Sequence, residues 1–322
     1  MKIEALIFLT IAVVMSMLCT NSFAVSQVSV FLQDIDSGTT SPAGNYRWMD
    51  VADHVYSESY QNSYNYTMAN VQVDYYTNAT ILYGHLTASN LKPNFAYQLK
   101  LVGDPDIDPA ANERIGLTGR WWQEEWDGTK WTNGQNLNNK GNGSSPNPND
   151  ETYKQRRDIV DPTSPTGKKY RYTGYLVFDY FITDASGNAD LDFQADSSYH
   201  VLWKTSQRSW SDNDGPIKTH TFSVTLPDPV NAYDENYAES TVGVFGEWER
   251  LPIGGVFLPC GDYQAKFILT EESFHGSGLA GGWAAAMGGD ANFTIVPEPL
   301  TILAVFTGIA GLAGYIRKRK VA

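Results

Sequence analysis

Short runs of β-forming residues recur along the middle of the chain, each bounded by Asn, Gly or Pro. Branched and aromatic residues fit a pleated, half-buried strand, whereas the bounding residues favour turns. From residue 25 onward there is no heptad pattern, no sustained helical period and no repeat of about 20 to 50 residues. The pattern predicts an all-β fold, an antiparallel β-sandwich. Strands are expected at residues 71–76, 81–88, 97–102, 175–183, 199–204, 219–226, 263–270 and 291–296.

The composition agrees with a β-rich extracellular protein. Aromatic residues make up 13% of the chain and charged residues only 18%, with a formal net charge of -13. Binding to nucleic acid depends on neutralising phosphates with Lys and Arg, so an acidic protein of this kind is not expected to have a nucleic-acid partner. Of the two cysteines, Cys19 lies in residues 1–24, which are expected to be a signal peptide, so Cys260 has no partner for an internal disulfide once that segment is removed.

The N-terminus has the pattern of a signal peptide. Lys2 precedes an apolar run at residues 6–18, which is short for a membrane span but typical of a signal-peptide core. Ser22-Phe23-Ala24 then gives the small-x-small pattern of a cleavage site. We expect residues 1–24 to be a signal peptide cleaved between Ala24 and Val25, with a retained anchor or lipidation of Cys19 as the alternatives.

The C-terminus combines three features in a fixed order. Val296, Pro297, Glu298 and Pro299 are followed by an apolar segment at residues 300–316, and then by the basic run Arg317-Lys318-Arg319-Lys320. A helix of about 17 residues is just long enough to cross the hydrocarbon of a bilayer, and basic residues stay on the cytoplasmic side. The pattern predicts a single C-terminal transmembrane helix with the bulk of the protein outside the cell.

This order of motif, apolar helix and basic tail resembles the PEP-CTERM sorting domain of bacteria that also make exopolysaccharide. The resemblance covers residues 296–322 and implies that an exosortase, a membrane-embedded cysteine transpeptidase, recognises Pro297, Glu298 and Pro299 and that the helix is lost on processing. It implies signal peptidase and exosortase as partners, exopolysaccharide as a further candidate, and transient anchoring in the inner membrane. The location implied is the bacterial cell surface or extracellular matrix. A plain tail anchor behind a stiff Pro-rich linker is the alternative.

The body between the ends divides into a β-rich region at residues 25–132, a polar loop or linker at 133–169 and a second β-rich region at 170–295. Leu91-Lys92-Pro93-Asn94 followed by Tyr97 resembles the tyrosine corner of fibronectin type III and related sandwiches. Residues 184–189 lie between two apolar runs and predict a hairpin connection in which Gly187 takes a positive φ.

A tryptophan-rich run at residues 120–131 contains the most distinctive side chains of the body. Asp127-Gly128 predicts a two-residue hairpin turn that pairs Trp126 with Thr129, Glu125 with Lys130 and Glu124 with Trp131. Strand alternation then places Trp122, Glu124, Trp126 and Trp131 on one face. Such a face suits sugar stacking and hydrogen bonding to hydroxyls, but burial in a core is the more common use of aromatic side chains on a strand.

Asp104, Asp106 and Asp108 alternate as ligands of a calcium loop do. Pro105 and Pro109 interrupt them and the turn glycine is absent, so a solvated loop is the leading interpretation and calcium the weaker one.

No spacing typical of catalysis was found, including zinc-protease, phosphate-loop, dinucleotide and nucleophile-elbow motifs. We therefore expect no catalytic residue, no metal and no cofactor. The function expected is that of an exported, noncatalytic cell-surface or matrix protein. A carbohydrate-binding module with an aromatic platform is the alternative, followed by a glycan-active enzyme whose carboxylate pair the sequence cannot identify.

Overall fold

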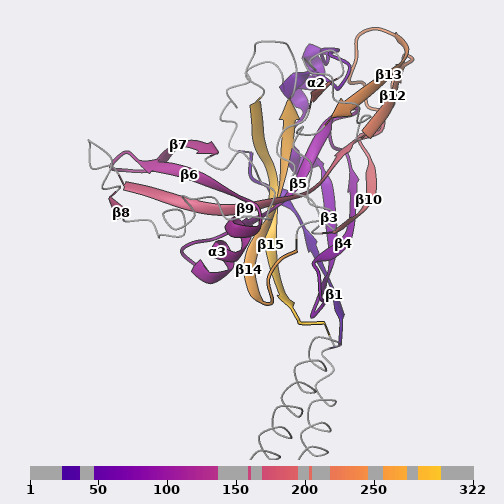
Figure 1. The fold of residues 1–322 in the computed structure, drawn as a ribbon. Coiled ribbons are helices and arrows are strands. Elements are labelled where there is room, and N and C mark those ends of the chain that lie inside the picture. The colour runs from indigo at the N-terminus through magenta and orange to yellow at the C-terminus, as the bar shows by residue number, and fades with distance from the viewer. Residues whose placement is uncertain are drawn as a thin grey trace, which may run out of the picture.

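The structure is a computed structural model that describes residues 24–36, 47–136, 159–160, 169–194, 203–204, 218–245, 257–273 and 282–298. Within these ranges the strands form three antiparallel sheets (Figure 1). The first sheet has the order β1 (Ser26–Phe31), β3 (Asn70–Thr77), β4 (Tyr83–Ser89) and β10 (Ala189–Gln194). The second has the order β2 (Gln33–Asp34), β15 (Gly282–Ile295), β14 (Gly261–Ser273), β5 (Ala96–Gly103), β9 (Lys169–Ile182), β6 (Arg120–Trp126) and β7 (Trp131–Asn136), with β8 (Ile159–Val160) paired to β9. The third has the order β11 (Trp203–Lys204), β13 (Tyr237–Phe245) and β12 (Lys218–Val224).

The main hydrophobic core is formed mostly by residues of the first and second sheets, together with Phe222 and Val224 of β12 and side chains of the short helices. Alternate side chains of β3 point into it, because successive residues of a strand face opposite sides of the sheet. Tyr75 of the first sheet packs against Phe267 of the second, with ring centroids 5.2 Å apart, and Phe193 of β10 reaches the same ring at 6.0 Å. The prediction of an all-β, antiparallel fold is confirmed. Strands overlap every predicted run that lies in the described residues, although β9, β14 and β15 are longer than predicted.

Short helices of the described ranges connect the strands: α2 (Glu58–Ser63), the 3-10 helix η2 (Tyr66–Met68) and α3 (Pro109–Thr118). The sequence analysis did not identify α3, which buries Ala111 and Ile115 against the second sheet. Among the helices of the described ranges, none has both the length and the apolar sequence needed to cross a membrane. The apolar segments at residues 6–18 and 300–316 lie outside those ranges.

The side chain of Tyr97, at the start of β5, bonds back to the connection that precedes the strand. Its hydroxyl accepts a hydrogen bond from the backbone N–H of Lys92 at 3.1 Å. A tyrosine hydroxyl that bonds back to the backbone a few residues upstream is the defining contact of a tyrosine corner.

The connection at residues 184–188 is a tight turn, but it is not a hairpin within one sheet. It joins β9 of the second sheet to β10 of the first, so the chain crosses between layers here. The prediction of a hairpin was wrong because the apolar runs on either side are both strands but pair with different neighbours. Gly187 does take a positive φ of 76°, as predicted, and its amide donates to the carbonyl oxygen of Asp184 at 3.0 Å.

The two predicted β-rich regions contribute neighbouring strands to the second sheet. Strand β5, from the first region, lies between β14 and β9, both from the second region. Strands β6 to β9 extend to one side of the molecule as an arm (Figure 1). The predicted loop at 133–169 contains the end of β7 and strand β8, and its residues 137–158 and 161–168 lie outside the described residues.

The two ends of the described body lie next to each other. Asn78, in the connection between β3 and β4, donates from its side-chain amide to the carbonyl oxygen of Ala24 at 3.4 Å and from its backbone to that of Thr294 at 3.0 Å. The N–H of Val296 donates to the carbonyl oxygen of Ala79 at 2.9 Å. The body therefore begins and ends at one site, at the lower end of β1 and β15 in Figure 1.

Candidate functional site

The hairpin of β6 and β7 forms at the predicted place with a different turn. Trp126 pairs directly with Trp131, so residues 127–130 form the loop, and the predicted two-residue turn and its three pairs were wrong. The reason is the Asp127 side chain, whose Oδ1 accepts from the backbone N–H groups of Thr129 at 2.8 Å and Lys130 at 2.9 Å. These bonds stabilise a longer turn and lower the pKa of Asp127.

The observed register still places the aromatic side chains together. Trp122, Glu124 and Trp126 alternate along β6 and therefore share one face, and Trp131 lies directly opposite Trp126. The rings of Trp126 and Trp131 are tilted by 58° with centroids 5.1 Å apart, and Trp126 is 36% exposed. Trp121 points to the other face, where it is fully buried against Tyr172. The run thus separates into Trp121, which is buried with Tyr172 in a small cluster apart from the main core, and a group of side chains on the opposite face.

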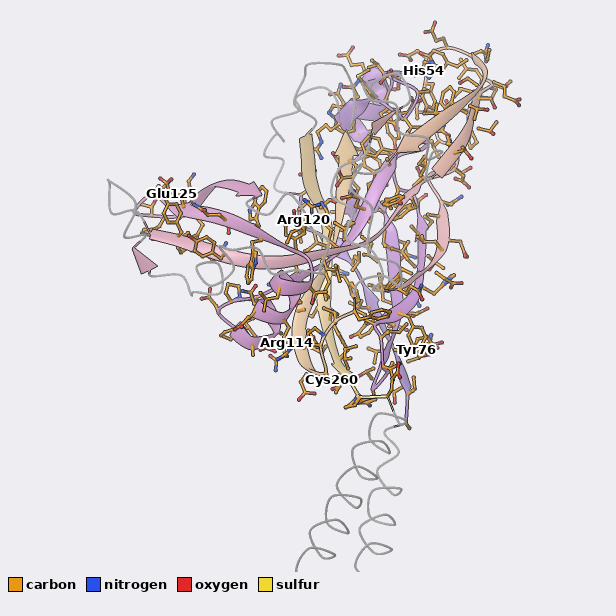
Figure 2. All side chains as sticks on the ribbon, in the orientation of Figure 1. His54, Tyr76, Arg114, Arg120, Glu125 and Cys260 are labelled. Carbon is orange, nitrogen blue, oxygen red and sulfur yellow. The ribbon has the colours of Figure 1, made fainter. Side chains whose placement is uncertain are left out.

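Arg171 of β9 joins this face. Its guanidinium lies 5.2 Å from the ring centre of Trp131 and binds Oε2 of Glu124, with an Nε to Oε2 distance of 2.8 Å and a still shorter contact from Nη2. Glu124 and Arg171 are direct neighbours in the pairing of β6 with β9. Figure 2 shows the length of this arm, with Arg120 near the centre of the molecule and Glu125 near the far end.

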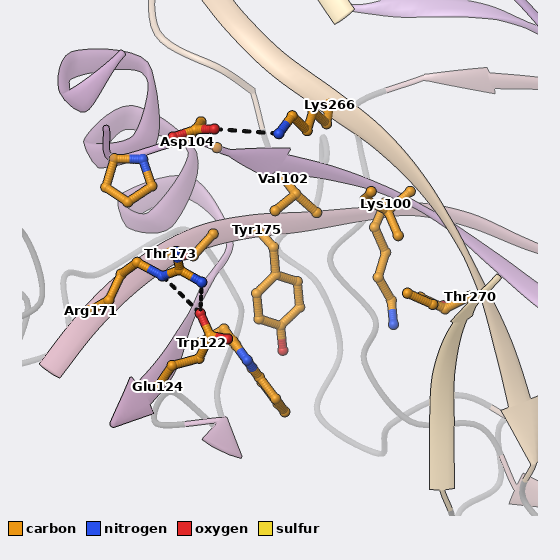
Figure 3. A pocket seen from close by; sticks show the side chains of 14 residues that line it. Lys100, Val102, Asp104, Trp122, Glu124, Arg171, Thr173, Tyr175, Lys266 and Thr270 are labelled. Carbon is orange, nitrogen blue, oxygen red and sulfur yellow. Dashed lines mark hydrogen bonds and ion pairs between the residues drawn. The ribbon is translucent and has the colours of Figure 1, made fainter. Parts of the chain in front are cut away.

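Next to Trp122 the same face of the second sheet encloses a cavity of about 450 Å³ (Figure 3). Its walls come from β5, β6, β9, β14 and β15. On β5, β9, β14 and β15, residues of the opposite face belong to the main core, and on β6 the opposite face carries the buried Trp121. Thus Leu99 and Leu101 of β5 are core residues, whereas Lys100 and Val102 line the cavity. Tyr175 of β9 provides a second aromatic wall.

The charged side chains around the cavity are paired. Lys100 binds Glu272 at 3.1 Å and Lys266 binds Asp104 at 3.4 Å. Burial lowers the pKa of Lys100, against the attraction of Glu272, and burial raises the pKa of Glu272. Thr270 donates to the same Glu272 oxygen at 2.9 Å, which further fixes this carboxyl.

Of the three aspartates considered as calcium ligands, Asp104 and Asp108 have other roles. Burial would raise the pKa of Asp104, but backbone hydrogen bonds from Asp106 and Ile107 outweigh it and lower the pKa. Asp108 caps α3 by accepting from the N–H of Ala111 at 2.9 Å, and Asp106 is exposed. The described part of the chain contains no group of three or more His, Cys, Asp or Glu placed to bind a metal ion.

The predicted processing sites lie partly in the described residues. Ala24 and Val25 precede β1, and Val296, Pro297 and Glu298 follow β15, with Pro297 and Glu298 exposed. Pro299 and the basic residues Arg317, Lys318, Arg319 and Lys320 lie outside the described residues.

Sequence reasoning missed Arg171, Tyr175, Lys100 and Lys266 as members of the site. The alternation within residues 169–182 indicates that Arg171 and Tyr175 share a face. Nothing in the sequence indicates that this strand lies between β5 and β6, because the strands come together from distant parts of the chain.

No protein-family model, no curated protein and no solved structure matches this chain. The fold and the site therefore define the class of protein directly: an all-β protein of antiparallel sheets with an aromatic hairpin and a neighbouring cavity on the face of the second sheet that points away from the core.

Proposed function

We propose that this chain is an exported, noncatalytic protein of the cell surface or extracellular matrix, with a β-sandwich ectodomain. Signal peptidase removes residues 1–24, and an exosortase recognises the Pro297-Glu298-Pro299 motif and removes the C-terminal helix. The observation that supports this most is the shared position of the two ends, since Asn78 binds both Ala24 and Thr294.

A shared position matters because both apolar segments have to reach the same membrane. If the body began and ended at opposite sides, one connecting segment would have to run around it. With the two ends adjacent, both apolar segments can enter the membrane from the same side of the body, which stays anchored there until it is released. Pro297 and Glu298 are exposed directly after β15, which agrees with recognition by a membrane enzyme.

The test is fractionation of native-host cells that express a variant with Pro297, Glu298 and Pro299 replaced by Ala. We expect this variant to stay in the inner-membrane fraction, while the unchanged protein is released from it. Pro229→Ala with Glu235→Ala, a double change at exposed positions, is the matched control and is released normally. Normal release of the triple variant would contradict sorting through this motif.

A second candidate function is polysaccharide binding at the hairpin, which the exposed Trp126 and its neighbour Trp131 favour. Aromatic rings at a surface can stack on the apolar faces of sugars, and the Glu124–Arg171 pair beside them can bond to hydroxyls. Neither Trp126 nor Trp131 belongs to a core cluster of the described residues.

A pull-down on exopolysaccharide tests this candidate when it is paired with thermal melting. Trp126→Ala should abolish retention and change stability by less than about 1 kcal/mol, because the side chain lies at the surface. Trp121→Ala, the buried neighbour, should cost about 3 to 5 kcal/mol and serves as the contrast. Full retention of the Trp126 variant would rule out the aromatic platform.

A further inference from the structure

The cavity beside the hairpin has the dimensions and lining of a small-molecule site. Its volume of about 450 Å³ lies within the range of known ligand pockets, roughly 300 to 1,000 Å³. Trp122 and Tyr175 supply aromatic walls and Val102 adds apolar surface (Figure 3). Ile268 is a further apolar lining residue. Such a site takes a ligand with at least one apolar face.

Polar groups that suit hydroxyls converge on the same space. Both hydrogen bonds from Arg171 go to Oε2 of Glu124, which leaves Oε1 outside this ion pair. Thr173, two residues after Arg171 on β9, adds a hydroxyl that can donate and accept. A carboxylate, a guanidinium and a hydroxyl side by side match neighbouring hydroxyl groups of a ligand.

The charge balance of the lining favours a neutral ligand. Among the described residues, every lysine or arginine that lines the cavity faces a carboxylate, so none of these cations is left to neutralise a phosphate or carboxylate, and neither lining carboxylate is left for an ammonium group. The three pairs are Lys100 with Glu272 at 3.1 Å, Arg171 with Glu124 at 2.8 Å, and Lys266 with Asp104 at 3.4 Å.

We propose that this cavity binds a single neutral sugar ring. Its apolar face packs on Trp122 and Tyr175, and its hydroxyls bind Glu124, Arg171 and Thr173. This inference rests on the second candidate function and extends it, because the cavity selects one ring, whereas the Trp126–Trp131 pair offers an open surface. Trp122 and Trp126 are four residues apart on β6, about 13 Å along an extended strand, so the two aromatic surfaces are distinct, although the Glu124–Arg171 pair lies beside both.

Calorimetric titration of the full-length chain in detergent tests the proposal. The probes are glucose, galactose and mannose as neutral sugars, glucuronate and galacturonate as charged ones, and inorganic phosphate. We expect at least one neutral sugar to bind, and to bind more tightly than its uronate. Glu124→Gln and Thr173→Val should each weaken that binding by about tenfold, the usual effect of a lost polar contact to a ligand. Glu239→Gln, at an exposed position on β13, is the matched control and should bind as the unchanged protein does.

Trp122→Ala should abolish binding, with thermal melting to show that the variant is folded. The proposal is overturned if no neutral sugar binds, if the uronates or phosphate bind more tightly, or if the Glu124 and Thr173 variants bind normally. The pull-down with Trp126→Ala distinguishes polysaccharide binding at the Trp126–Trp131 surface from sugar binding in the cavity. Loss of polysaccharide retention in that variant, without sugar binding in the cavity, removes this inference and leaves the aromatic platform intact.

Discussion

The ammonium group of Lys92 lies 2.6 Å from Oε1 of Glu271, and both side chains are buried in the body of the protein. The same oxygen accepts from Arg47 at 2.8 Å and from the hydroxyl of Tyr66 at 2.7 Å. Arg47 also contacts Asp36 at 2.5 Å, so two cations and two carboxylates balance one another. Through Arg47, the cluster connects Asp36, which follows β2, to Glu271 of β14.

Replacing Glu271 by Gln should destabilise the protein strongly. The change leaves the ammonium group of Lys92 buried without a carboxylate partner and leaves Arg47 with Asp36 alone. Breaking a buried ion pair in this way typically costs about 3 to 5 kcal/mol. Urea unfolding followed by circular dichroism measures the loss. Glu239→Gln, at an exposed site, should change the free energy of unfolding by less than about 0.5 kcal/mol. A similarly small loss for the Glu271 variant would mean that the cluster contributes little.

Lys92 should make stability depend on pH in the alkaline range. Burial lowers its pKa from 10.5 to about 8, against the attraction of Glu271. Between pH 8 and 10.5 the unfolded chain binds more protons at Lys92 than the folded protein does. The contribution of Lys92 to the free energy of unfolding therefore rises with pH over this range, and it is constant below pH 8. The stability of the unchanged protein relative to Lys92→Met should therefore increase by roughly 1 to 2 kcal/mol between about pH 7.5 and 9.5. A difference that stays constant or falls over this range would contradict the argument.

His85 links β4 to β10 through Asp192, with an Nδ1 to Oδ1 distance of 2.8 Å. This hydrogen bond is the main cause that raises the pKa of His85 above 6.5; burial opposes it, and Asp190 adds to it. The stabilisation is fully present below the unfolded pKa and is lost as pH rises through the folded pKa. An NMR titration should give a midpoint above 6.5 for His85, and Asp192→Asn should move it down. An unchanged midpoint in the variant would show that the contact is not formed in solution.

Gly187→Ala should disrupt the turn that carries the chain between the two sheets. Gly187 has a φ of 76°, and an added Cβ would lie 2.0 Å from the carbonyl oxygen of Leu91. We expect a loss of more than about 1 kcal/mol in thermal or urea unfolding. Gly128→Ala is the matched control, since its φ is 107° but its Cβ would meet open space. Equal losses for the two variants would argue against the close contact with Leu91.

The fold class could be predicted because burial alternates along the strands. Val71, Val73 and Tyr75 alternate with more polar residues and are all buried. This alternation can be read from the strand's own sequence, without knowing which strands pair with it. Helix α3 was missed although Asp108 and Pro109 are a typical start of a helix. The reason is its weak apolar face, with Ala111 and Ile115 as its main buried apolar side chains.

The site could be predicted only in part. Trp122, Glu124 and Trp126 share a face because they alternate along one strand, which the sequence shows directly. The turn was misjudged because the carboxylate of Asp127 binds two amides of the loop, and sequence alone does not separate this from a shorter turn. The Lys92–Glu271 pair spans 179 residues, and no local pattern indicates which carboxylate a buried lysine will meet.

The intact mass of the protein purified from its native host tests the central claim of export and sorting most directly. We expect a chain that begins at Val25 and lacks everything after Pro299, since the signal peptide and the sorting helix are both removed. A species that still carries Arg317-Lys318-Arg319-Lys320, in cells with an active exosortase, would contradict sorting and indicate a permanent membrane anchor.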